Sequence, residues 1–429
     1  MPHIVVIGAG ITGVTTAYEL IQSGYQVTVI DRHLYAAMET SFANGGQLSA
    51  CNAEVWNQKS TVFKGMKWMR EKQAPLLLNP SFSLHKYRWL IEFLGHIKHY
   101  QANTRETVRL ALLARQRLFE IAETEQIDFD LEKRGILHFY HNQADYQVAT
   151  AVNDLLCSGG LERHAVSSSE ILQIEPSLKG EYYAGFYCPD DATGDIHKFT
   201  VALADVAAAQ GVKFLYGMDV LEVQHQDNQV QIKIQPSPEN MQAEAVESHF
   251  QAEQNLQTQH NAQDIICADA VVVCAGVSSY QMAEKLGDRV NIYPVKGYSI
   301  TVQLNDAASQ TAAPWVSLLD ESAKIVTSRL GVDRLRIAGT AEFNGYNRDI
   351  RADRIQPLVN WVNQNFDIST EQVIPWAGLR PMMPNMMPVV GRGKREGVYY
   401  NTGHGHLGWT LSAATAAMIS QEIAQDFAV

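Results

Sequence analysis

The sequence predicts an α/β protein with two parts: a discontinuous, Rossmann-like dinucleotide-binding domain, and an α+β substrate domain built on a mixed or antiparallel sheet. Three observations predict this fold. A strand, a glycine turn and a helix open the chain, similar elements return after long intervals, and alternating apolar and polar residues fill much of the last third. The chain has 429 residues, which is also too long for one small core.

The first 31 residues form the most specific element. Apolar runs at 4–7 and 27–30 predict two buried strands, and the helix between them extends to about Gln22. A strand, a helix and a second strand in this order make a βαβ unit. Because a terminal acid follows the second strand, the alternative of a glycine turn that binds no nucleotide is disfavoured.

Each glycine of the turn GAGITG has its own role. Gly8 permits the tight turn, Gly10 lets backbone N–H groups approach a pyrophosphate, and Gly13 lets the helix pack closely on the sheet. The helix N-terminus faces the phosphates with its partial positive charge. Asp31 stands where a carboxylate accepts hydrogen bonds from ribose hydroxyls. The segment therefore predicts a dinucleotide site.

Composition narrows the choice of partners and compartment. A net charge of −12 argues against nucleic acid, because no basic surplus is present to neutralise phosphates. The five cysteines are scattered without a CxxC pair, which favours a reducing, cytoplasmic compartment and no metal site. A signal peptide does not fit before a strand that begins at residue 4, and no run approaches about 20 apolar residues. Peripheral contact with the inner face of the cytoplasmic membrane stays open.

Later segments resemble returns to the first domain. They include a helix over about 198–210 with a strand after it, the stretch DAVVVCAGVSSYQMAEKLG, and a strand, turn and helix at the C-terminus. We assign the dinucleotide-binding domain to 1–55, 165–225, 265–282 and 375–429, and the substrate domain to 56–164 and 283–374.

Two segments stand apart from this division. Residues 235–264 are polar and rich in glutamine, so we expect an excursion from a hairpin without a core of its own. Residues 55–100 are rich in Trp, Phe, Met and basic residues. Their helical spacing favours a packed core segment, and the alternative is a lid or an interfacial surface that contacts a membrane or an electron acceptor.

Two further features indicate a cofactor larger than NAD. The loop METSFANGGQLSA follows Asp31, where continuous nicotinamide-domain winding needs no such insertion. Gly403, Gly405 and Gly408 precede a final helix of small residues, which gives a second electropositive helix end. Reduced flavin carries negative charge, so two helix ends suit the two ends of FAD.

The motifs GAGITGV, ETSFANGGQLS, GDIHKFT, YPVKGYS, AGLRPMMPNMMPVVGR and NTGHGHLGWT carry a family resemblance. Along its whole length the chain resembles the FAD-dependent D-amino-acid oxidase superfamily. Within it, the chain is most similar to the bacterial D-amino acid dehydrogenases of the small-subunit type. The predicted fold is thus an α/β FAD-binding domain with an α+β substrate domain.

This resemblance implies the residues that contact FAD. Gly8, Gly10 and Gly13 are expected at the pyrophosphate and Asp31 at the adenosine ribose. The remaining FAD contacts are expected at Ile11, Thr12, Arg32, Ser41, Asn44, Gly45, Gly46, Gln47, Gly276, Gly405, Leu407, Gly408, Trp409 and Thr410. Noncovalent binding of FAD is expected, because this sequence has no cysteine at the C-terminal position where a covalent attachment of the family's kind would form.

The substrate is expected to bind at Arg380. A guanidinium holds an α-carboxylate through two parallel hydrogen bonds, and the superfamily uses the Arg of GLRP in this way. A structural ion pair is the alternative for this arginine. Lys296 is expected near the flavin or its bound water, with a surface lysine as the alternative, while Tyr298 and Lys324 are pocket candidates.

The implied reaction is oxidative deamination of D-amino acids to 2-oxo acids and ammonia, with hydride transfer to flavin N5 and electrons passed to a quinone or another carrier. His404 and His406 are expected to contact flavin or to pack in the turn, because the reaction needs orientation more than a dedicated base. The alternatives are an O2-dependent oxidase of glycine, sarcosine or another secondary amine, a flavin-binding protein without turnover, and a nicotinamide dehydrogenase.

Overall fold

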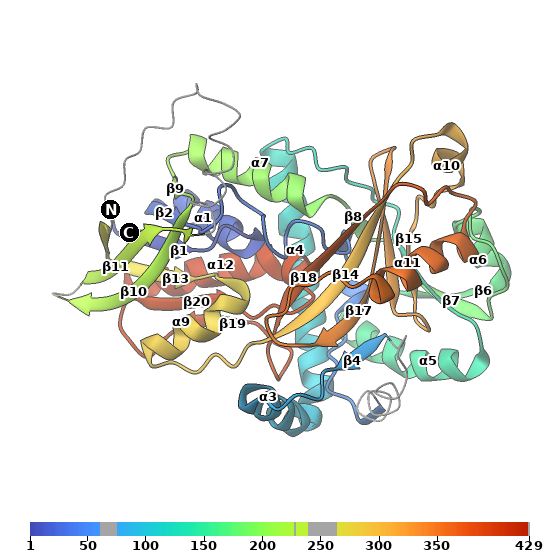
Figure 1. Ribbon diagram of the computed structural model, residues 1–429, viewed down its shortest axis with the longest axis horizontal. Helices are drawn as coiled ribbons and strands as arrows, with labels where there is room; N and C mark the ends of the chain where they lie inside the picture. The colour runs from blue at the N-terminus through green and yellow to red at the C-terminus, as the bar shows by residue number, and fades with distance from the viewer. Residues whose placement is uncertain (61–74, 227–228, 239–263, 428–429) are drawn as a thin grey trace.

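The computed structural model describes residues 1–60, 75–226, 229–238 and 264–427 (Figure 1). The lid alternative for 55–100 and the polar excursion at 235–264 therefore fall partly outside the described residues. The excursion is flanked by β11 (Gln229–Pro236) and β12 (Asp264–Ala268), which pair antiparallel, so the described flanks agree with a hairpin.

Six strands form one sheet with the order β19-β20-β13-β1-β2-β9. All neighbouring pairs are parallel except β19 with β20. Since the strands come from four separated parts of the chain, the predicted discontinuous α/β domain is confirmed. The strands are β1 (His3–Ile7), β2 (Gln26–Ile30), β9 (Lys213–Leu215), β13 (Ala270–Val273), β19 (Val389–Arg392) and β20 (Val398–Thr402).

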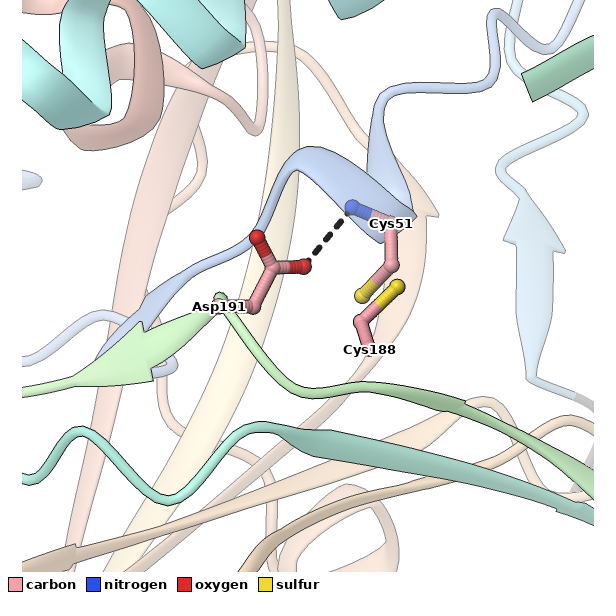
Figure 2. A group of neighbouring side chains, drawn as sticks. All are labelled: Cys51, Cys188 and Asp191. Atoms are coloured by element: carbon pink, nitrogen blue, oxygen red, sulfur yellow. Dashed lines mark hydrogen bonds between the residues drawn. The ribbon is translucent and has the colours of Figure 1, made fainter. Parts of the chain in front are cut away.

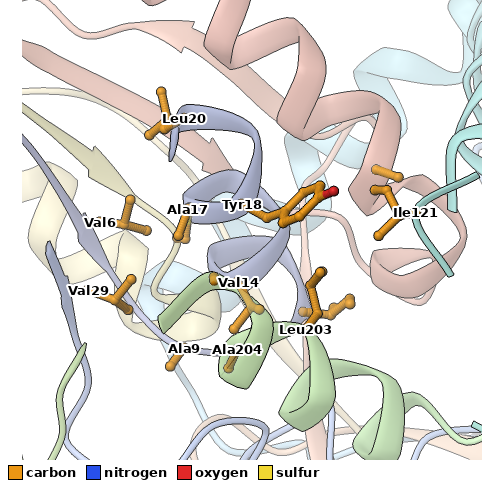
Figure 3. Packing of buried hydrophobic residues seen from close by; sticks show 14 of the residues in the cluster. Val6, Ala9, Val14, Ala17, Tyr18, Leu20, Val29, Ile121, Leu203 and Ala204 are labelled. Carbon is orange, nitrogen blue, oxygen red and sulfur yellow. The ribbon is translucent and has the colours of Figure 1, made fainter. Parts of the chain in front are cut away.

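Both faces of this sheet are covered, because side chains alternate along each strand. Ile4 and Val6 of β1 face the helices α1 (Ile11–Gln22), α7 (Ile196–Ala209) and α12 (Gly408–Asp426). Figure 3 shows this packing, with Val6 and Val29 of the sheet beside α1 and α7. Val5 and Ile7 face a three-stranded antiparallel sheet. Its strands are β10 (Met218–Gln226), β11 (Gln229–Pro236) and β12 (Asp264–Ala268).

A second, nine-stranded sheet is mixed, as predicted. Its order is β18-β14-β17-β16-β15-β5-β7-β6, with β4 beside β17. Pairs β15–β5 and β17–β4 are parallel and the other pairs are antiparallel. The strands are β4 (Leu76–Leu78), β5 (Ile136–Tyr140), β6 (His164–Ser167), β7 (Ala184–Cys188), β14 (Tyr293–Gln303), β15 (Ser317–Asp320), β16 (Ile325–Leu330), β17 (Arg334–Phe343) and β18 (Val373–Met382).

The other elements surround these sheets. Helix α11 (Ala352–Asn365) packs on one face of β14 and β17 through an apolar cluster. The long helix α4 (Tyr100–Thr124) lies against α12. The remaining elements are β3 (Gln47–Leu48), β8 (Ala192–Thr193), α3 (Leu84–Gly95), α5 (Gln143–Ser158), α6 (Ser168–Ile174), α9 (Ser279–Leu286) and α10 (Ala307–Ala312), with 3-10 turns η1 (Ala50–Asn52), η2 (His96–His99) and η3 (Gly276–Ser278).

The sheet pairing differs from the predicted domain ranges at two boundaries. Strand β7 lies within 165–225 but pairs with β5 and β6 in the nine-stranded sheet. Strand β18 lies largely within 375–429 but pairs with β14 over ten residues. The predicted ranges are continuous stretches of sequence, whereas strand pairing joins residues far apart in the chain.

We expect Gly13→Ala to destabilise the first βαβ unit. A Cβ at Gly13 would lie 1.8 Å from the carbonyl oxygen of Gly8, so helix α1 would have to move away from the strand. The free energy of unfolding should fall by about 3 kcal/mol, at the upper end of the usual cost of overpacking, because the added methyl meets backbone atoms. Chemical denaturation measures this change. Gly95→Ala is the matched control, because no atom lies within 4 Å of its added methyl, and equal stability of the two variants would contradict the prediction.

Candidate active site

A cavity of about 530 Å³ lies at the carboxyl ends of the parallel strands β1, β2 and β13. Its lining includes Gly8 after β1, Asp31 after β2 and Gly276 after β13, while residues of β14, β17 and β18 form another wall. Ligands of open α/β sheets bind at this edge, where loops and helix N-termini converge. The two sheets together therefore enclose one site.

One end of the cavity is built by the first βαβ unit. Helix α1 begins after Gly10, and its first turn holds no acidic side chain among the described residues. The backbone N–H of Ile11 donates to Ser41 Oγ at 3.0 Å. Asp31 accepts one backbone hydrogen bond on each oxygen, from Ala9 at 2.6 Å and His33 at 2.8 Å. Each oxygen keeps a lone pair, and the arrangement fits the pyrophosphate and ribose of a dinucleotide.

The other end is built by the turn before α12. Gly403 and Gly405 have φ of 79° and 61°, a left-handed backbone that favours glycine. This geometry brings the N-terminus of α12, beginning at Gly408, to the cavity. As in α1, the described first turn of α12 contains no acidic side chain. Two positive helix ends thus face one cavity, which suits an extended cofactor with anionic groups.

Most residues predicted to contact FAD line this cavity. They are Gly8, Gly10, Ile11, Thr12, Asp31, Arg32, Ser41, Asn44, Gly45, Gln47, Gly276, Gly405, Gly408, Trp409 and Thr410.

Three predicted contacts do not line the cavity. Gly13 packs against the carbonyl of Gly8 and serves helix–strand packing. A side chain at Gly46 would meet Ser328, and Leu407 packs in an apolar cluster. These residues shape the loops that carry the lining.

Arg380 lines the cavity from strand β18 on the same face as Trp376 and Gly378, because residues two apart share a face of a strand. Its Nη1 donates to the carbonyl oxygen of Thr340 at 3.0 Å. Among the described residues no carboxylate pairs with this guanidinium, so the ion-pair alternative lacks a partner. Burial lowers the pKa of Arg380 to about 10. The side chain is a buried cation at neutral pH.

The structure places Lys296 neither in the wall of the cavity nor at the surface. Its side chain is fully buried and does not line the cavity. The ammonium binds Asn347 Oδ1 at 2.7 Å and the carbonyl oxygen of Asp349 at 3.1 Å, with Glu342 at 3.5 Å. Alternation along β14 turns Lys296 away from the cavity-facing Gly297.

The other two pocket candidates differ in what they offer. Tyr298 borders the cavity, but its side chain packs in the apolar cluster beneath α11 and its hydroxyl donates to Glu342 Oε2 at 2.7 Å, so it offers the cavity no free polar group. Lys324 lines the cavity and pairs with Glu321, and the nearby carboxylate counteracts the cost of burial and raises the pKa of Lys324. Lys324 is thus a charged part of the wall.

Both histidines of the C-terminal turn line the cavity as neutral rings. Burial lowers the pKa of His404 to about 3, and its Nε2 lies 2.9 Å from Thr415 Oγ1. Burial, with help from the Arg380 cation, lowers the pKa of His406 to about 4. His406 stacks on Trp56 with ring centroids 4.8 Å apart. Such histidines hold the turn and give the site no charge.

Several lining residues were not predicted. His138 and Glu321 are joined by a hydrogen bond of 3.1 Å, and Glu54 and Arg163 also reach the wall. They come from strands and loops with no shared motif, so no sequence signal groups them. Trp376 is different, because its spacing of four residues from Arg380 on a strand could have placed it on the same face.

One buried group resembles a metal site in composition. The ligand atoms of Cys51, Cys188 and Asp191 lie within 4.8 Å of one another (Figure 2). Asp191, however, already accepts the backbone N–H groups of Ala50 and Cys51 and pairs with Arg115. Burial also raises the pKa of the Cys51 thiol. We interpret this group as an anchor for the η1 turn.

Comparisons with known proteins agree with this geometry. A family model described as "DAO: FAD dependent oxidoreductase" matches residues 3–422. A D-amino acid dehydrogenase 3 of Mesorhizobium japonicum is 55% identical over 430 residues, covering 100% of this chain and 98% of the relative. A D-amino acid dehydrogenase of Dechloromonas aromatica is 36% identical over 429 residues, covering 98% of this chain and 96% of the relative.

Solved structures support the fold. A glycine oxidase of Geobacillus kaustophilus superimposes with a TM-score of 0.74 at 17% identity, covering 99% of this chain and 95% of that structure. An L-proline dehydrogenase of P. horikoshii gives a TM-score of 0.71 at 16% identity, covering 99% and 94%. Because the family model spans nearly the whole chain and full-length relatives are 55% and 36% identical, the chain belongs to the DAO family of FAD-dependent oxidoreductases, and the helix ends and glycine turns of its cavity suit FAD.

Proposed function

We propose that this chain oxidises D-amino acids to 2-oxo acids and ammonia with noncovalently bound FAD, and that its electrons pass to a quinone or a similar carrier. The observation that carries the proposal is Arg380, a buried cation that faces the cavity without a carboxylate partner among the described residues. A substrate α-carboxylate would supply this partner. The choice of D-amino acids rests on the names of the full-length relatives.

The chain's own residues bind and orient the substrate. Arg380 would hold the carboxylate through its forked N–H groups, which fixes both position and orientation. Bound FAD supplies the hydride acceptor for the substrate Cα. Gly10 and the turn at Gly405 would hold the two ends of that cofactor through backbone N–H groups.

The polar wall sets the charge around the substrate. His138 is buried, and burial lowers its pKa to about 4. Lys324 is balanced by Glu321, whose pKa lies well below its usual range because of Lys324 and His138. Arg380 differs from Lys324, because among the described residues no carboxylate balances the charge of its guanidinium.

The acceptor proposal is supported by the surface of α3. Four large apolar residues are exposed on one stripe of this helix, at spacings of three and four residues. The opposite stripe, with Trp89 and Phe93, is buried. The exposed residues are Leu84, Tyr87, Ile91 and Leu94.

Basic side chains accompany this stripe. Arg88, Lys98 and His99 are exposed beside it, although the chain as a whole carries a net charge of −12. Helices with an apolar stripe and basic neighbours bind anionic bilayer surfaces. In the described part of the chain, the helices are too short or too polar to span a bilayer. We propose that α3 contacts the surface of the membrane in which a quinone acceptor would lie.

The first experiment is an anaerobic absorbance titration of the purified flavoprotein with D- and L-amino acids, glycine and sarcosine. D-amino acids should bleach the oxidised flavin band, and recovery should be fast with a soluble quinone and slow with air. Bleaching only by glycine or sarcosine, with fast recovery in air, would instead indicate an amine oxidase. Absence of bleaching by every amine would contradict both reactions.

We expect Arg380→Gln to weaken substrate binding. The substrate carboxylate would then enter the cavity without its cation, so kcat/KM should fall by roughly 30-fold or more, and Arg380→Lys should lose less because it keeps the charge but not the fork. Steady-state kinetics and the Kd of a 2-oxo acid measure this effect. Arg109→Gln on the exposed face of α4 is the control, and an equal loss in both variants would refute the role of Arg380.

We expect the double variant Leu84→Glu, Ile91→Glu to lose affinity for anionic vesicles by roughly tenfold or more, because two apolar anchors become anionic. Reduction of a soluble dye should be unchanged, while reduction of a vesicle-embedded quinone should fall. Vesicle co-sedimentation measures the affinity. Val332→Glu, an exposed apolar position outside α3, is the control. Unchanged vesicle binding in the double variant would remove α3 as the contact.

A further inference from the structure

We propose that Gly297 and Thr340 are positioning residues that seat the Arg380 guanidinium for carboxylate binding. This proposal rests on the proposed function of Arg380. Gly297 of β14 and Thr340 of β17, two neighbouring strands of the nine-stranded sheet, both contact this buried guanidinium.

Gly297 forms a seat beneath the guanidinium. Strand β14 pairs with β18 so that Gly297 lies directly opposite Gly378. On β18, Gly378 stands midway between Trp376 and Arg380. A Cβ at Gly297 would lie 2.3 Å from Arg380 Nη2, 2.5 Å from Cζ and 3.0 Å from Nε. Because one added atom would meet three atoms of the planar group, the guanidinium lies over the Cα of Gly297. Any side chain at this position would displace it.

Thr340 supplies the hydrogen-bond acceptor. The pairing of β14 with β17 is interrupted between Lys296 and Tyr298, which pair with Glu342 and Gly339. Thr340 lies in this bulge with a φ of 61°, a conformation that a β-branched residue rarely adopts. Its carbonyl oxygen accepts the hydrogen bond from Arg380 Nη1 at 3.0 Å.

Together, the seat and the acceptor fix the guanidinium. Backbone strain in a β-branched residue persists only where the surrounding structure holds it, and such sites cluster at ligand clamps. Among the described residues, the Thr340 carbonyl is the hydrogen-bond partner of Arg380, so the other N–H groups stay available for a carboxylate. Gly297 and Thr340 act through Arg380 and need not touch the substrate.

The test compares Gly297→Ala with Arg380→Gln and with the double variant, using the FAD-loaded enzyme. Flavin absorbance reports the Kd of a 2-oxo acid, and steady-state kinetics give KM and kcat for a D-amino acid. Gly297→Ala should raise Kd and KM by roughly tenfold to 100-fold, with FAD content and thermal stability retained. In the Arg380→Gln background the same substitution should add little, which a merely structural role would not produce.

The outcomes separate the two proposals. If Arg380→Gln raises Kd but Gly297→Ala does not, Gly297 does not position the guanidinium, and the proposal that Arg380 binds the carboxylate is retained. If neither variant changes Kd, both proposals fail. If the two increases in Kd multiply in the double variant, Gly297 acts independently of Arg380, and its proposed role as a positioning residue is rejected. Gly95→Ala, which adds the same methyl in open space, should leave Kd and KM unchanged.

A second variant tests the assignment to the Thr340 backbone. Thr340→Ala removes the hydroxyl and one methyl but keeps the carbonyl that Arg380 binds. The Kd of the 2-oxo acid should change by less than about twofold, because the acceptor is retained. An increase of roughly tenfold or more would overturn the assignment to the carbonyl.

Discussion

The antiparallel pairing of β14 with β18 is the constraint on which the site depends. Ten consecutive residue pairs join these strands, from Tyr293 with Met382 to Val302 with Val373. Because side chains alternate along each strand, a shift of one residue would turn Arg380 out of the cavity. The same pairing connects the substrate sheet to the segment that leads into the turn before α12. It therefore sets the distance between the substrate wall and the flavin end of the cavity.

Charge is distributed unevenly between the two faces of the sheet that contains β14 and β18. The two helix N-termini and Arg380 turn positive charge toward the cavity, and the described first turns of both helices hold no acidic residue. The buried Lys296 differs, because Glu342 and two further oxygens surround it on the other face of the sheet. Lys296 is bound by a carboxylate and two other oxygens, whereas Arg380 donates to one backbone carbonyl and has no carboxylate partner among the described residues. Burial and pairing thus distinguish these two cations better than residue type does.

The architecture also explains how one cavity serves a long cofactor and a small substrate. The parallel sheet ends its strands at the glycine turns, and the mixed sheet closes the opposite side. The bulge at Thr340 and the paired glycines Gly297 and Gly378 make room between the sheets for two large side chains. Neutral His404 and His406 fill the turn without adding charge. In the proposed reaction, the orientation of the substrate would depend on this backbone geometry as much as on side chains.

The sequence by itself determined the first βαβ unit, the separated segments of its domain and the C-terminal turn and helix, and it singled out Arg380, which lines the cavity. These features depend on local patterns: period-two strands, glycine turns at helix starts, and a short motif. Tertiary structure alone decided the membership of β7 and β18 in the larger sheet, the burial of Lys296 and the grouping of His138 with Glu321. The physical reason is that strand pairing and side-chain burial depend on contacts between residues far apart in the chain, and such contacts leave no local pattern in the sequence.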